Sequence, residues 1–328
     1  MINTQSLRDE IVTYVTEQHN HAQFFGSILA ANSDGIIVNE SFGFANIELN
    51  VPNHSRTKYR IGSLTKAFTA VAILQLISQQ KATLDSTLDQ FIADYPEGNH
   101  ITIHHLLSHT SGIHNFSNRE DVMEWYKSTS SLTATIDAFK NKQLQFMPGE
   151  RFEYSNSNYI LLTYIIEQLS NISYEQYLQD NIFDPLEMNH TGYDHDTNLI
   201  VDRASGYYFE NEVLRNVPYI NMDIPQGAGG LYSTVEDMYK WDRGLRSNKL
   251  LNADMTKKMF TPNLEHYGYG WIIQQFDGHD VVFHTGGIHG FNSVMCRLIE
   301  VDVCVIAICN YSIDIGAIAV HVSKMLLD

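Results

Sequence analysis

A serine and a lysine stand three positions apart, at Ser63 and Lys66, where the apolar run RIGSLTKAFTAVAILQL begins. Positions i and i+3 of a helix share one face, so the hydroxyl and the amine can come together. Burial without a counter-charge lowers the pKa of a lysine towards the range in which the neutral amine accepts a proton. The two side chains could therefore act as a nucleophile and a base. The same spacing is expected about once by chance in such a chain, and a helix-capping serine beside a lysine that reaches solvent would look the same.

The position of Ser63 suits acyl transfer in a second way. At the start of a helix, unpaired N–H groups and the positive end of the helix dipole favour the negative charge that develops when a carbonyl carbon is attacked. Over residues 67–77 only Thr69 and Gln75 are polar, so this helix should be buried nearly all round. A buried helix would hold the serine rigidly and keep Lys66 out of bulk water.

A phenol and an amide stand together in a second segment, FEYSNSNYILL. Tyr154 and Asn156 alternate along an extended stretch just before a helix, so both side chains can point the same way. These groups suit a site that handles protons and acyl groups. The alternative is a packing tyrosine followed by a helix N-cap at Asn156 or Asn158.

A third segment, FHTGGIHGFNS, places His284 and Thr285 at the end of an apolar strand. Gly286 and Gly287 follow, so no side chain separates the backbone from a bound ligand. The alternative is a glycine bulge at a sheet edge. Taken together, the three segments supply the polar groups of a candidate site.

Both ends of the chain carry β signals beside a helix. Residues 5–19 have the apolar spacing of an amphipathic helix, and two β-rich runs flank the turn Asn32-Ser33-Asp34-Gly35. Four strands with short turns fill most of the last seventy residues before a final helix, so they should pair antiparallel. We therefore predict an α+β fold, in which an antiparallel sheet built from both chain ends is flanked by helices.

The middle of the chain is mainly helical in pattern from about residue 84 to 191. Helix caps are predicted at Thr102, for a helix that Gly112 ends, at Asn158, and in a capping box of Ser233 with Glu236. We therefore predict a sandwich domain over 1–85 and 200–328, a mainly helical subdomain over 86–199, and an active site in the cleft between them.

Composition excludes several classes of partner. Thirty-eight acidic and twenty-one basic residues give a net charge of −17, which opposes both nucleic acid and anionic lipid surfaces. The longest uncharged, mostly apolar run is about a dozen residues, too short for a membrane span. The first 25 residues lack the apolar core of a signal peptide, so the sequence as given predicts a cytoplasmic protein, or an extracytoplasmic one if a leader has been removed.

Metal and disulfide chemistry are not expected. Cys296, Cys304 and Cys309 are odd in number and lie in apolar surroundings, which predicts buried, reduced thiols. His105 and His109 stand four apart, a spacing that can bind zinc, but the chain has no H-E-x-x-H and no paired cysteines. No serine stands in a G-x-S-x-G turn, so the α/β type of Ser-His-Asp hydrolase is not supported either. We predict no metal and no cofactor.

The order of the three segments resembles that of a known family, the penicillin-recognising serine hydrolases, in the motifs Ser63-x-x-Lys66, Tyr154-x-Asn156 and His284-Thr285-Gly286. The branch in question groups class C β-lactamases, D-alanyl-D-alanine carboxypeptidases, D-amino-acid peptidases and related carboxylesterases. Other segments, such as ITIHHLLSHTSGI and AGGLYSTVEDMYKW, also resemble that family in the right order. The resemblance therefore covers nearly the whole chain and implies the β-lactamase/transpeptidase-like fold.

The resemblance implies a role for each polar group. Ser63 would be the acylated nucleophile, with Lys66 and Tyr154 sharing the work of base and proton shuttle. Which of these two takes the serine proton stays open. Asn156 would orient the acyl or amide group of the substrate, and the N–H groups of Ser63 and Gly287 would form the oxyanion hole.

The strand residues bear on the substrate. By the resemblance, His284 and Thr285 would line the strand edge and, in the peptidases, hold the substrate carboxylate. Class C β-lactamases usually carry lysine where this chain has His284, whereas peptidases and esterases often carry histidine. A neutral imidazole brings less positive charge to a carboxylate than lysine does, and this departure disfavours an efficient β-lactamase.

The expected function is a hydrolase working through an acyl-enzyme at Ser63. A D-peptidase, carboxypeptidase or carboxylesterase is favoured, with a small peptide, ester or β-lactam as substrate. A class C-like β-lactamase is the alternative. A non-catalytic penicillin-binding or sensor module is the alternative from another class, because fold alone never proves activity.

Overall fold

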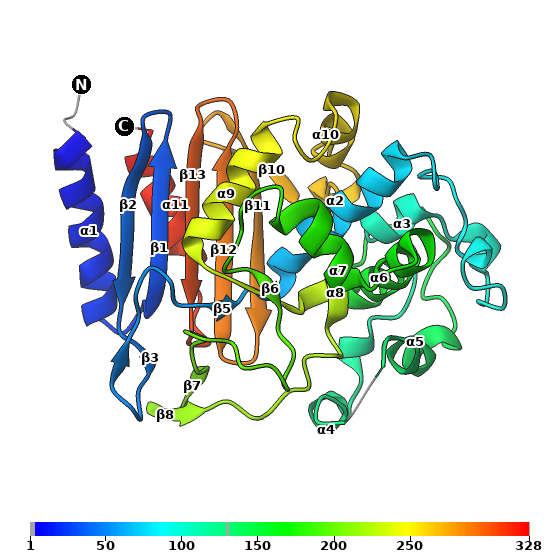
Figure 1. Ribbon diagram of the computed structural model, residues 1–328, viewed down its shortest axis with the longest axis horizontal. Helices are drawn as coiled ribbons and strands as arrows, with labels where there is room; N and C mark the ends of the chain where they lie inside the picture. The colour runs from blue at the N-terminus through cyan, green and yellow to red at the C-terminus, as the bar shows by residue number, and fades with distance from the viewer. Residues whose placement is uncertain (1–3, 129–130, 328) are drawn as a thin grey trace.

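The computed structural model describes residues 4–128 and 131–327. Within these ranges a six-stranded antiparallel sheet lies on one side and helices fill the other (Figure 1). The strand order β10-β11-β12-β13-β1-β2 shows that both ends of the chain contribute, which confirms the predicted fold class. The strands are β1 (Gly26–Asn32), β2 (Gly35–Phe42), β10 (Ile272–Phe276), β11 (His279–Ile288), β12 (Phe291–Leu298) and β13 (Val303–Cys309).

Alternating side chains give this sheet two apolar faces. On β1, Ile28 packs in a cluster with α1 (Thr4–Asn20) and α11 (Gly316–Met325), which cover one face. The next residue, Leu29, joins the cluster on the opposite face, where α9 (Val235–Arg246) contacts β1 and β13 and lies in front of the sheet (Figure 1). The helices predicted at the two chain ends are confirmed.

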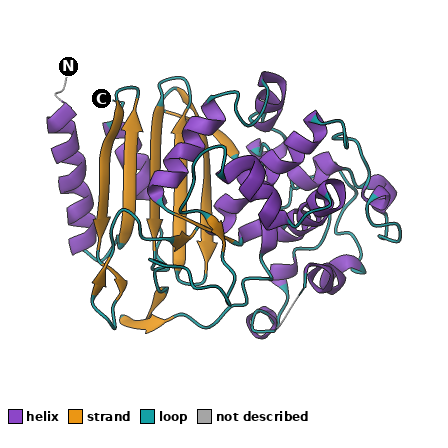
Figure 2. Ribbon diagram, viewed as in Figure 1, coloured by secondary structure: helices purple, strands orange, loops and turns teal. Residues whose placement is uncertain are grey.

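Helices occupy most of the other half of the molecule (Figure 2). The α-helices besides α1, α9 and α11 are α2 (Thr65–Ser78), α3 (Ile103–Leu107), α4 (Val122–Trp125), α5 (Leu132–Lys140), α6 (Asn156–Ser170), α7 (Tyr174–Leu178), α8 (Gln226–Gly229) and α10 (Ala253–Met259). Shorter turns are η1 (Gly62–Leu64), η2 (Leu88–Gln90), η3 (Gly98–His100), η4 (Phe116–Asn118), η5 (Gln179–Phe183) and η6 (Leu264–His266). Across the described ranges, none of these helices combines the length and the apolar character needed to cross a bilayer.

Short strands complete the fold and tie the two halves together. They pair as β3 (Phe44–Asn46) with β4 (Val51–Pro52), as β5 (Tyr59–Arg60) and β6 (Gly192–Tyr193) on either side of β9 (Leu231–Ser233), and as β7 (Tyr207–Glu210) with β8 (Val213–Asn216). The three-stranded sheet leads directly from β5 into η1, so it fixes where the following helix starts.

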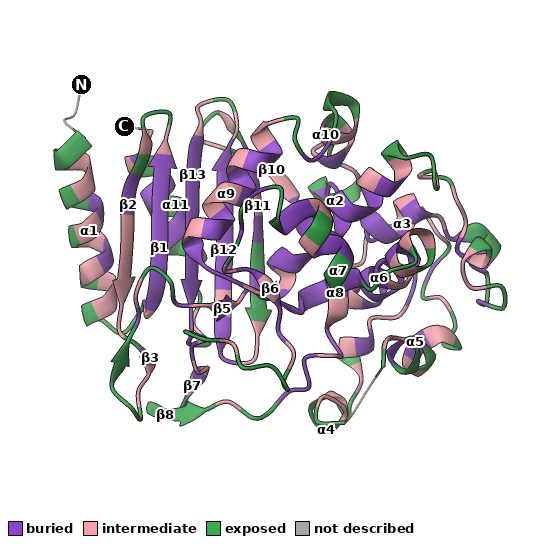
Figure 3. Ribbon diagram, in the orientation of Figure 1, coloured by how far each residue is buried: buried purple, intermediate pink, exposed green. Residues whose placement is uncertain are grey.

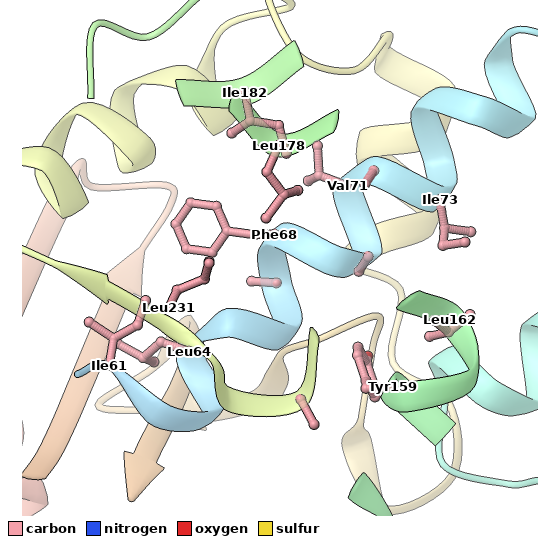
Figure 4. Close-up of a cluster of buried hydrophobic side chains, with 14 of the residues drawn as sticks. Ile61, Leu64, Phe68, Val71, Ile73, Tyr159, Leu162, Leu178, Ile182 and Leu231 are labelled. Carbon is pink, nitrogen blue, oxygen red and sulfur yellow. The ribbon is translucent and has the colours of Figure 1, made fainter. Parts of the chain in front are cut away.

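The helix α2 is buried almost throughout, as its sequence predicts (Figure 3). Phe68 stacks on Trp241 of α9 at 4.0 Å between ring centroids, and Val71 and Phe68 lie beside Leu178 and Ile182 (Figure 4). Packing on all sides makes rotation or translation of α2 costly, because every neighbour would have to move with it. The residues at its N-terminus are therefore held in place by the core.

The three cysteines are buried and free, as predicted. Cys296 and Cys309 belong to the cluster under α1 and α11, and Cys304 belongs to the cluster on the other face. Burial raises the pKa of each thiol, so each stays protonated at neutral pH.

The cap predicted at Thr102 is confirmed, but the end predicted for its helix is wrong. The Thr102 hydroxyl accepts a hydrogen bond from a backbone N–H three residues on. The helix α3 then ends at Leu107 and does not continue to Gly112. His109 adopts a left-handed φ of 58°, which turns the chain out of the helix.

The cap predicted at Asn158 is also wrong. The helix α6 begins at Asn156, and Ser155 occupies the N-cap position. Asn158 is fully buried, where its amide accepts a hydrogen bond from Ser111 at 2.6 Å and lies 3.2 Å from His109 Nδ1. Its side chain thus serves a tertiary contact, which no local pattern reveals.

The capping box predicted at Ser233 and Glu236 is wrong, because α9 is capped one residue later. Thr234 caps α9, since its hydroxyl accepts a hydrogen bond from Asp237 N at 3.1 Å. The hydroxyl of Ser233 instead pairs with Thr191 Oγ1 at 2.7 Å, and Glu236 accepts a hydrogen bond from a side chain of β2. The side chains of both residues of the predicted box therefore form hydrogen bonds to other elements and do not cap the helix.

The division into a sandwich domain (1–85 and 200–328) and a helical subdomain (86–199) stays a prediction. One hydrophobic cluster runs from Leu29 on the sheet, through α2, to Leu162 on α6. The two parts therefore share a core, and we propose the division only as a description of the chain's path.

Candidate active site

Ser63 lies on the short turn η1, which leads directly into α2, as its sequence position predicts. The turn packs against β11 so closely that a Cβ added to Gly62 would lie 2.8 Å from Gly287 N. Gly62 has a φ of +51°, which also favours glycine there. Ser293 Oγ donates a hydrogen bond of 2.7 Å to the Ile61 carbonyl and fastens the turn to the sheet. Ser63 is thereby fixed beside the end of β11.

Lys66 is fully buried and points back towards Ser63. Its Nζ lies 3.0 Å from Ser63 Oγ, 2.8 Å from Asn156 Oδ1 and 2.7 Å from the Ala228 carbonyl oxygen. These three hydrogen-bond partners are all uncharged. Burial without a counter-charge holds the pKa of Lys66 well below its usual range, as the sequence leads us to expect.

The three partners of Lys66 fit a neutral amine. The Asn156 and Ala228 oxygens can only accept hydrogen bonds, and a neutral amine has two N–H groups to give them. Its lone pair is then left for the third partner, the hydroxyl of Ser63. The geometry can therefore draw the proton of Ser63 onto Lys66.

The orientation of the Asn156 amide follows from two residues that the sequence analysis missed. Asn156 Nδ2 donates to Ser117 Oγ at 3.0 Å, and Ser117 Oγ in turn donates to Asn115 Oδ1 at 2.8 Å. Because the hydroxyl hydrogen of Ser117 is already donated to Asn115, Ser117 Oγ can only accept a hydrogen bond from Asn156. The NH₂ group of the Asn156 amide must therefore face Ser117, and the amide oxygen faces Lys66. The one local signal was the N-x-S spacing, in which Asn115 caps the turn η4.

Tyr154 is the second side chain that contacts the hydroxyl of Ser63. Its hydroxyl donates to Ser63 Oγ at 3.0 Å, and the ring centroid lies 4.9 Å from Lys66 Nζ. Burial raises the pKa of Tyr154 above its usual value, so the side chain is a phenol at neutral pH and can give a proton. The first two predicted motifs thus meet at one oxygen atom.

His109 is a further buried residue behind Tyr154. Its ring lies 4.3 Å from the Tyr154 ring, and its Nδ1 accepts a hydrogen bond from Ser155 N at 3.2 Å. Burial holds the pKa of His109 well below its usual range. His105, the other histidine of the candidate zinc pair, accepts a hydrogen bond at Nδ1 from the backbone N–H of Thr102. Across 4–128 and 131–327, no group of side chains is placed to hold a metal ion.

The predicted strand residues alternate between the two faces of β11. His284 and Gly286 are buried, whereas Thr285 and Gly287 are exposed. His284 Nδ1 donates to the Thr285 carbonyl at 2.6 Å, and its Nε2 accepts from the hydroxyl of Tyr267 at 3.0 Å. Burial lowers the pKa of His284 to about 4, so the ring is neutral. Both ring nitrogens are engaged, and the role of holding a carboxylate stays a prediction.

The edge of β11 is open beside Ser63. β10 pairs with β11 only as far as Phe283, which leaves residues 284–288 unpaired on that side in the described structure. Gly287 faces Asn292, one step from the pair that closes the hairpin. Because hydrogen-bonded and non-hydrogen-bonded pairs alternate, the N–H of Gly287 points to the open edge. A carbonyl oxygen above Ser63 could reach it.

A cavity of about 120 Å³ opens beside Ser63. Its polar lining includes Ser63, Asn156 and His289. Its apolar walls are formed by Phe116, Tyr126, Ile220, Pro225 and Ile288. The arrangement can therefore bring a small acyl compound to an activated hydroxyl.

Comparison with known proteins places this chain in a family. A family model described as Beta-lactamase matches residues 13–317. Penicillin-binding protein 4* of Bacillus subtilis (strain 168) is 29% identical over 324 residues, which cover 90% of this chain and 70% of that protein. A crystal structure of a penicillin binding protein from Bacillus halodurans superposes with a TM-score of 0.84 at 28% identity, covering 96% of this chain and 98% of that one.

One solved structure supports the fold alone. A D-amino acid amidase from Ochrobactrum anthropi has a TM-score of 0.84, but its sequence identity is 22%, with 97% of this chain and 96% of that chain covered. Sequence and structure agree over nearly the whole chain, and the matched region contains the meeting point of Ser63, Lys66 and Tyr154. The chain belongs to the β-lactamase family of serine hydrolases.

Proposed function

We propose that this protein is a hydrolase that forms an acyl-enzyme at Ser63, of the D-peptidase, carboxypeptidase or carboxylesterase kind. The observation that carries the proposal is the pair of 3.0 Å contacts from Ser63 Oγ, one to Lys66 Nζ and one to Tyr154 Oη. One contact offers a base and the other an acid. Relatives named as penicillin-binding proteins support acyl transfer as the reaction class.

Acylation begins with the neutral amine of Lys66. The amine takes the proton of Ser63 as Oγ attacks the substrate carbonyl carbon, so Lys66 becomes an ammonium and the carbonyl oxygen becomes an oxyanion. The N–H groups of Ser63 and Gly287 receive that oxyanion. Each such donor contributes roughly two to three orders of magnitude in rate.

Collapse of the tetrahedral intermediate needs a proton for the leaving group. Tyr154 donates the proton of its phenol to the departing alcohol or amine and recovers one from the ammonium of Lys66. The bond from the acyl carbon to the leaving group breaks, and the ester bond to Ser63 remains. Water then attacks that ester with the same groups in reverse order, which releases a carboxylic acid and restores Ser63.

Intact-protein mass spectrometry tests the proposal directly. Mixing with p-nitrophenyl acetate should add one acetyl group to the protein, and a peptide map should place it on Ser63. Ser63→Ala should abolish both the adduct and the hydrolysis, whereas Ser33→Ala, on an exposed turn, should change neither. Undiminished hydrolysis by Ser63→Ala would falsify the acyl-enzyme, and absence of any adduct with esters and β-lactams would favour a non-catalytic module.

A further inference from the structure

We propose that the site selects uncharged esters or amides with a compact apolar group, and discriminates against substrates that carry a carboxylate. This inference rests on the proposed acyl-enzyme and names its substrate class. It separates the carboxylesterase or amidase kind from the carboxypeptidase and from the β-lactamase, whose substrates carry a carboxylate.

The first support is the lining of the cavity beside Ser63. Phe116, which is 3% exposed, forms one wall and is held edge-on against Trp125 at 5.3 Å between ring centroids. Ile220 and Ile288 add aliphatic surface. His289 is the one titratable imidazole in the lining, and burial lowers its pKa, so it is neutral at pH 7. A charged group entering this cavity would lose water without gaining an ionic partner.

The second support is the position of the residues expected to hold a carboxylate. His284 is 3% exposed and neutral, with Tyr267 on one ring nitrogen and a backbone carbonyl on the other. Thr285 alternates to the opposite face of β11, where it lines a separate hollow. Neither residue carries a positive charge, and the ring of His284 has no free donor left for a carboxylate.

The third support is the charge of that separate hollow, which shares Gly287 with the cavity beside Ser63 and measures about 260 Å³. Its one ionisable side chain is Asp314, which is exposed and accepts a hydrogen bond from Gly316 N at 2.9 Å. A carboxylate placed here would meet a like charge. The open edge of β11 can still bind an uncharged carbonyl or amide through backbone groups alone.

Cations on neighbouring segments are already paired. Arg60 precedes the serine turn. Its Nε lies 2.6 Å from Asp194 Oδ2, and its Nη2 lies 3.7 Å from Asp196 Oδ1. Arg119, which follows η4, forms two hydrogen bonds with the carboxylate of Asp121. Redirecting Arg119 to a substrate would leave the carboxylate of Asp121 without this partner. Redirecting Arg60 would leave the fully buried Asp194 with Arg203 alone.

A matched pair of substrates tests the inference. The butyrate ester of 3-hydroxybenzamide has a neutral leaving group, and the butyrate ester of 3-hydroxybenzoate has an anionic one of nearly the same shape. We expect kcat/KM for the neutral ester to exceed that for the anionic ester by at least about tenfold, after each is divided by its uncatalysed rate. The part of this ratio that comes from Asp314 should shrink as salt screens its exposed charge.

A charge variant sharpens the result. Asp314→Asn should narrow the ratio of the two rates severalfold, whereas Asp277→Asn, on an exposed turn between β10 and β11, should leave the ratio unchanged. An anionic ester hydrolysed as fast as the neutral one, or benzylpenicillin acylating Ser63 as fast as the neutral ester does, would overturn the substrate inference while leaving the acyl-enzyme intact. Failure of both esters to acylate Ser63 would instead remove the proposed function on which the inference rests.

Discussion

Lys66 Nζ lies 2.8 Å from the amide oxygen of Asn156, at a place where an aspartate carboxylate of nearly the same shape would fit. The amide gives the buried amine an acceptor without giving it a counter-charge. A carboxylate at this distance would favour the ammonium form, whereas the amide lets burial lower the pKa of Lys66. The choice between two nearly isosteric side chains therefore controls whether Lys66 can accept a proton.

Asn156→Asp should raise the pKa of Lys66 and slow acylation at neutral pH. An opposite charge this close moves a pKa by about one to three units, so the rising limb of the pH–rate profile should shift upward by at least about one unit. The acylation rate at pH 7 should fall at least about tenfold, because less of the amine is neutral. Stopped-flow measurement of acylation from pH 5 to 10 follows this limb.

The exposed substitution Asn171→Asp is the matched control and should leave the limb in place. A limb that does not move in Asn156→Asp would mean that Lys66 is not the group whose deprotonation sets the rate.

Tyr154→Phe should show whether the phenol delivers a proton to the leaving group or removes the proton of Ser63. The variant keeps the ring that packs on His109 but loses the hydroxyl that lies 3.0 Å from Ser63 Oγ. An amide or alkyl ester needs a proton on its leaving group, so its acylation should slow by about 100-fold or more. A p-nitrophenyl ester leaves as a stable anion, so its acylation should slow much less.

The buried Tyr174→Phe, whose hydroxyl pairs with Thr69, controls for the loss of a phenol elsewhere in the core. Equal losses for both kinds of substrate in Tyr154→Phe would make the phenol part of the base and not the acid for the leaving group.

The two adjacent glycines of β11 should respond differently to alanine. A Cβ on Gly286 would overlap the carbonyl oxygen of Ile61 and Ser293 Oγ, so it would push the serine turn off the sheet. A Cβ on Gly287 would meet only Asn292 Oδ1, at 3.3 Å. Gly286→Ala should therefore lower the free energy of unfolding by about 2 kcal/mol, while Gly287→Ala should change it by less than about 0.5 kcal/mol.

Urea titration followed by circular dichroism measures both values. A Gly286→Ala protein as stable as the wild type would show that the turn and the strand can separate without cost, contrary to their close packing.

The sequence was sufficient for the fold, because its helices and strands give strong local signals, and for the residues that meet at Ser63, because three motifs stand in an order that resembles a known family. The β-rich runs separated by short turns near the C-terminus and the apolar run after Lys66 each predict an element that the structure contains. The order of three motifs then identified the family. These signals depend only on local sequence or on the order of motifs along the chain, so they can be recognised without knowledge of tertiary contacts.

The sequence was not sufficient to predict the role of a side chain that forms a hydrogen bond with a residue distant in the chain. Asn158 was predicted to cap a helix, but its side chain is buried and contacts Ser111 and His109. Ser117 orients the amide of Asn156 from a turn 39 residues away, and only the fold brings the two together. The burial of His284 under Tyr267 likewise depends on a pairing that no spacing in the strand predicts.

Burial of His284 should make the protein sensitive to acid over a defined range. Its pKa is about 4 in the folded state and about 6.5 when exposed, so between these values the unfolded chain binds a proton that the folded chain does not. The free energy of unfolding should therefore rise with pH from 4 to 6.5 and then level off, with His284 contributing about 3 kcal/mol across the range. His109, buried and with a lowered pKa, adds in the same direction.

His284→Asn should flatten this dependence, because the variant has no imidazole to protonate. The comparison uses the slope of unfolding free energy against pH, so a uniform loss of stability from the missing contact with Tyr267 does not affect it. The exposed His21→Asn should keep the wild-type slope. Urea titrations at half-unit steps from pH 4 to 8 give the curves, and an unchanged slope in His284→Asn would show that the imidazole binds a proton in the folded state as readily as in the unfolded chain.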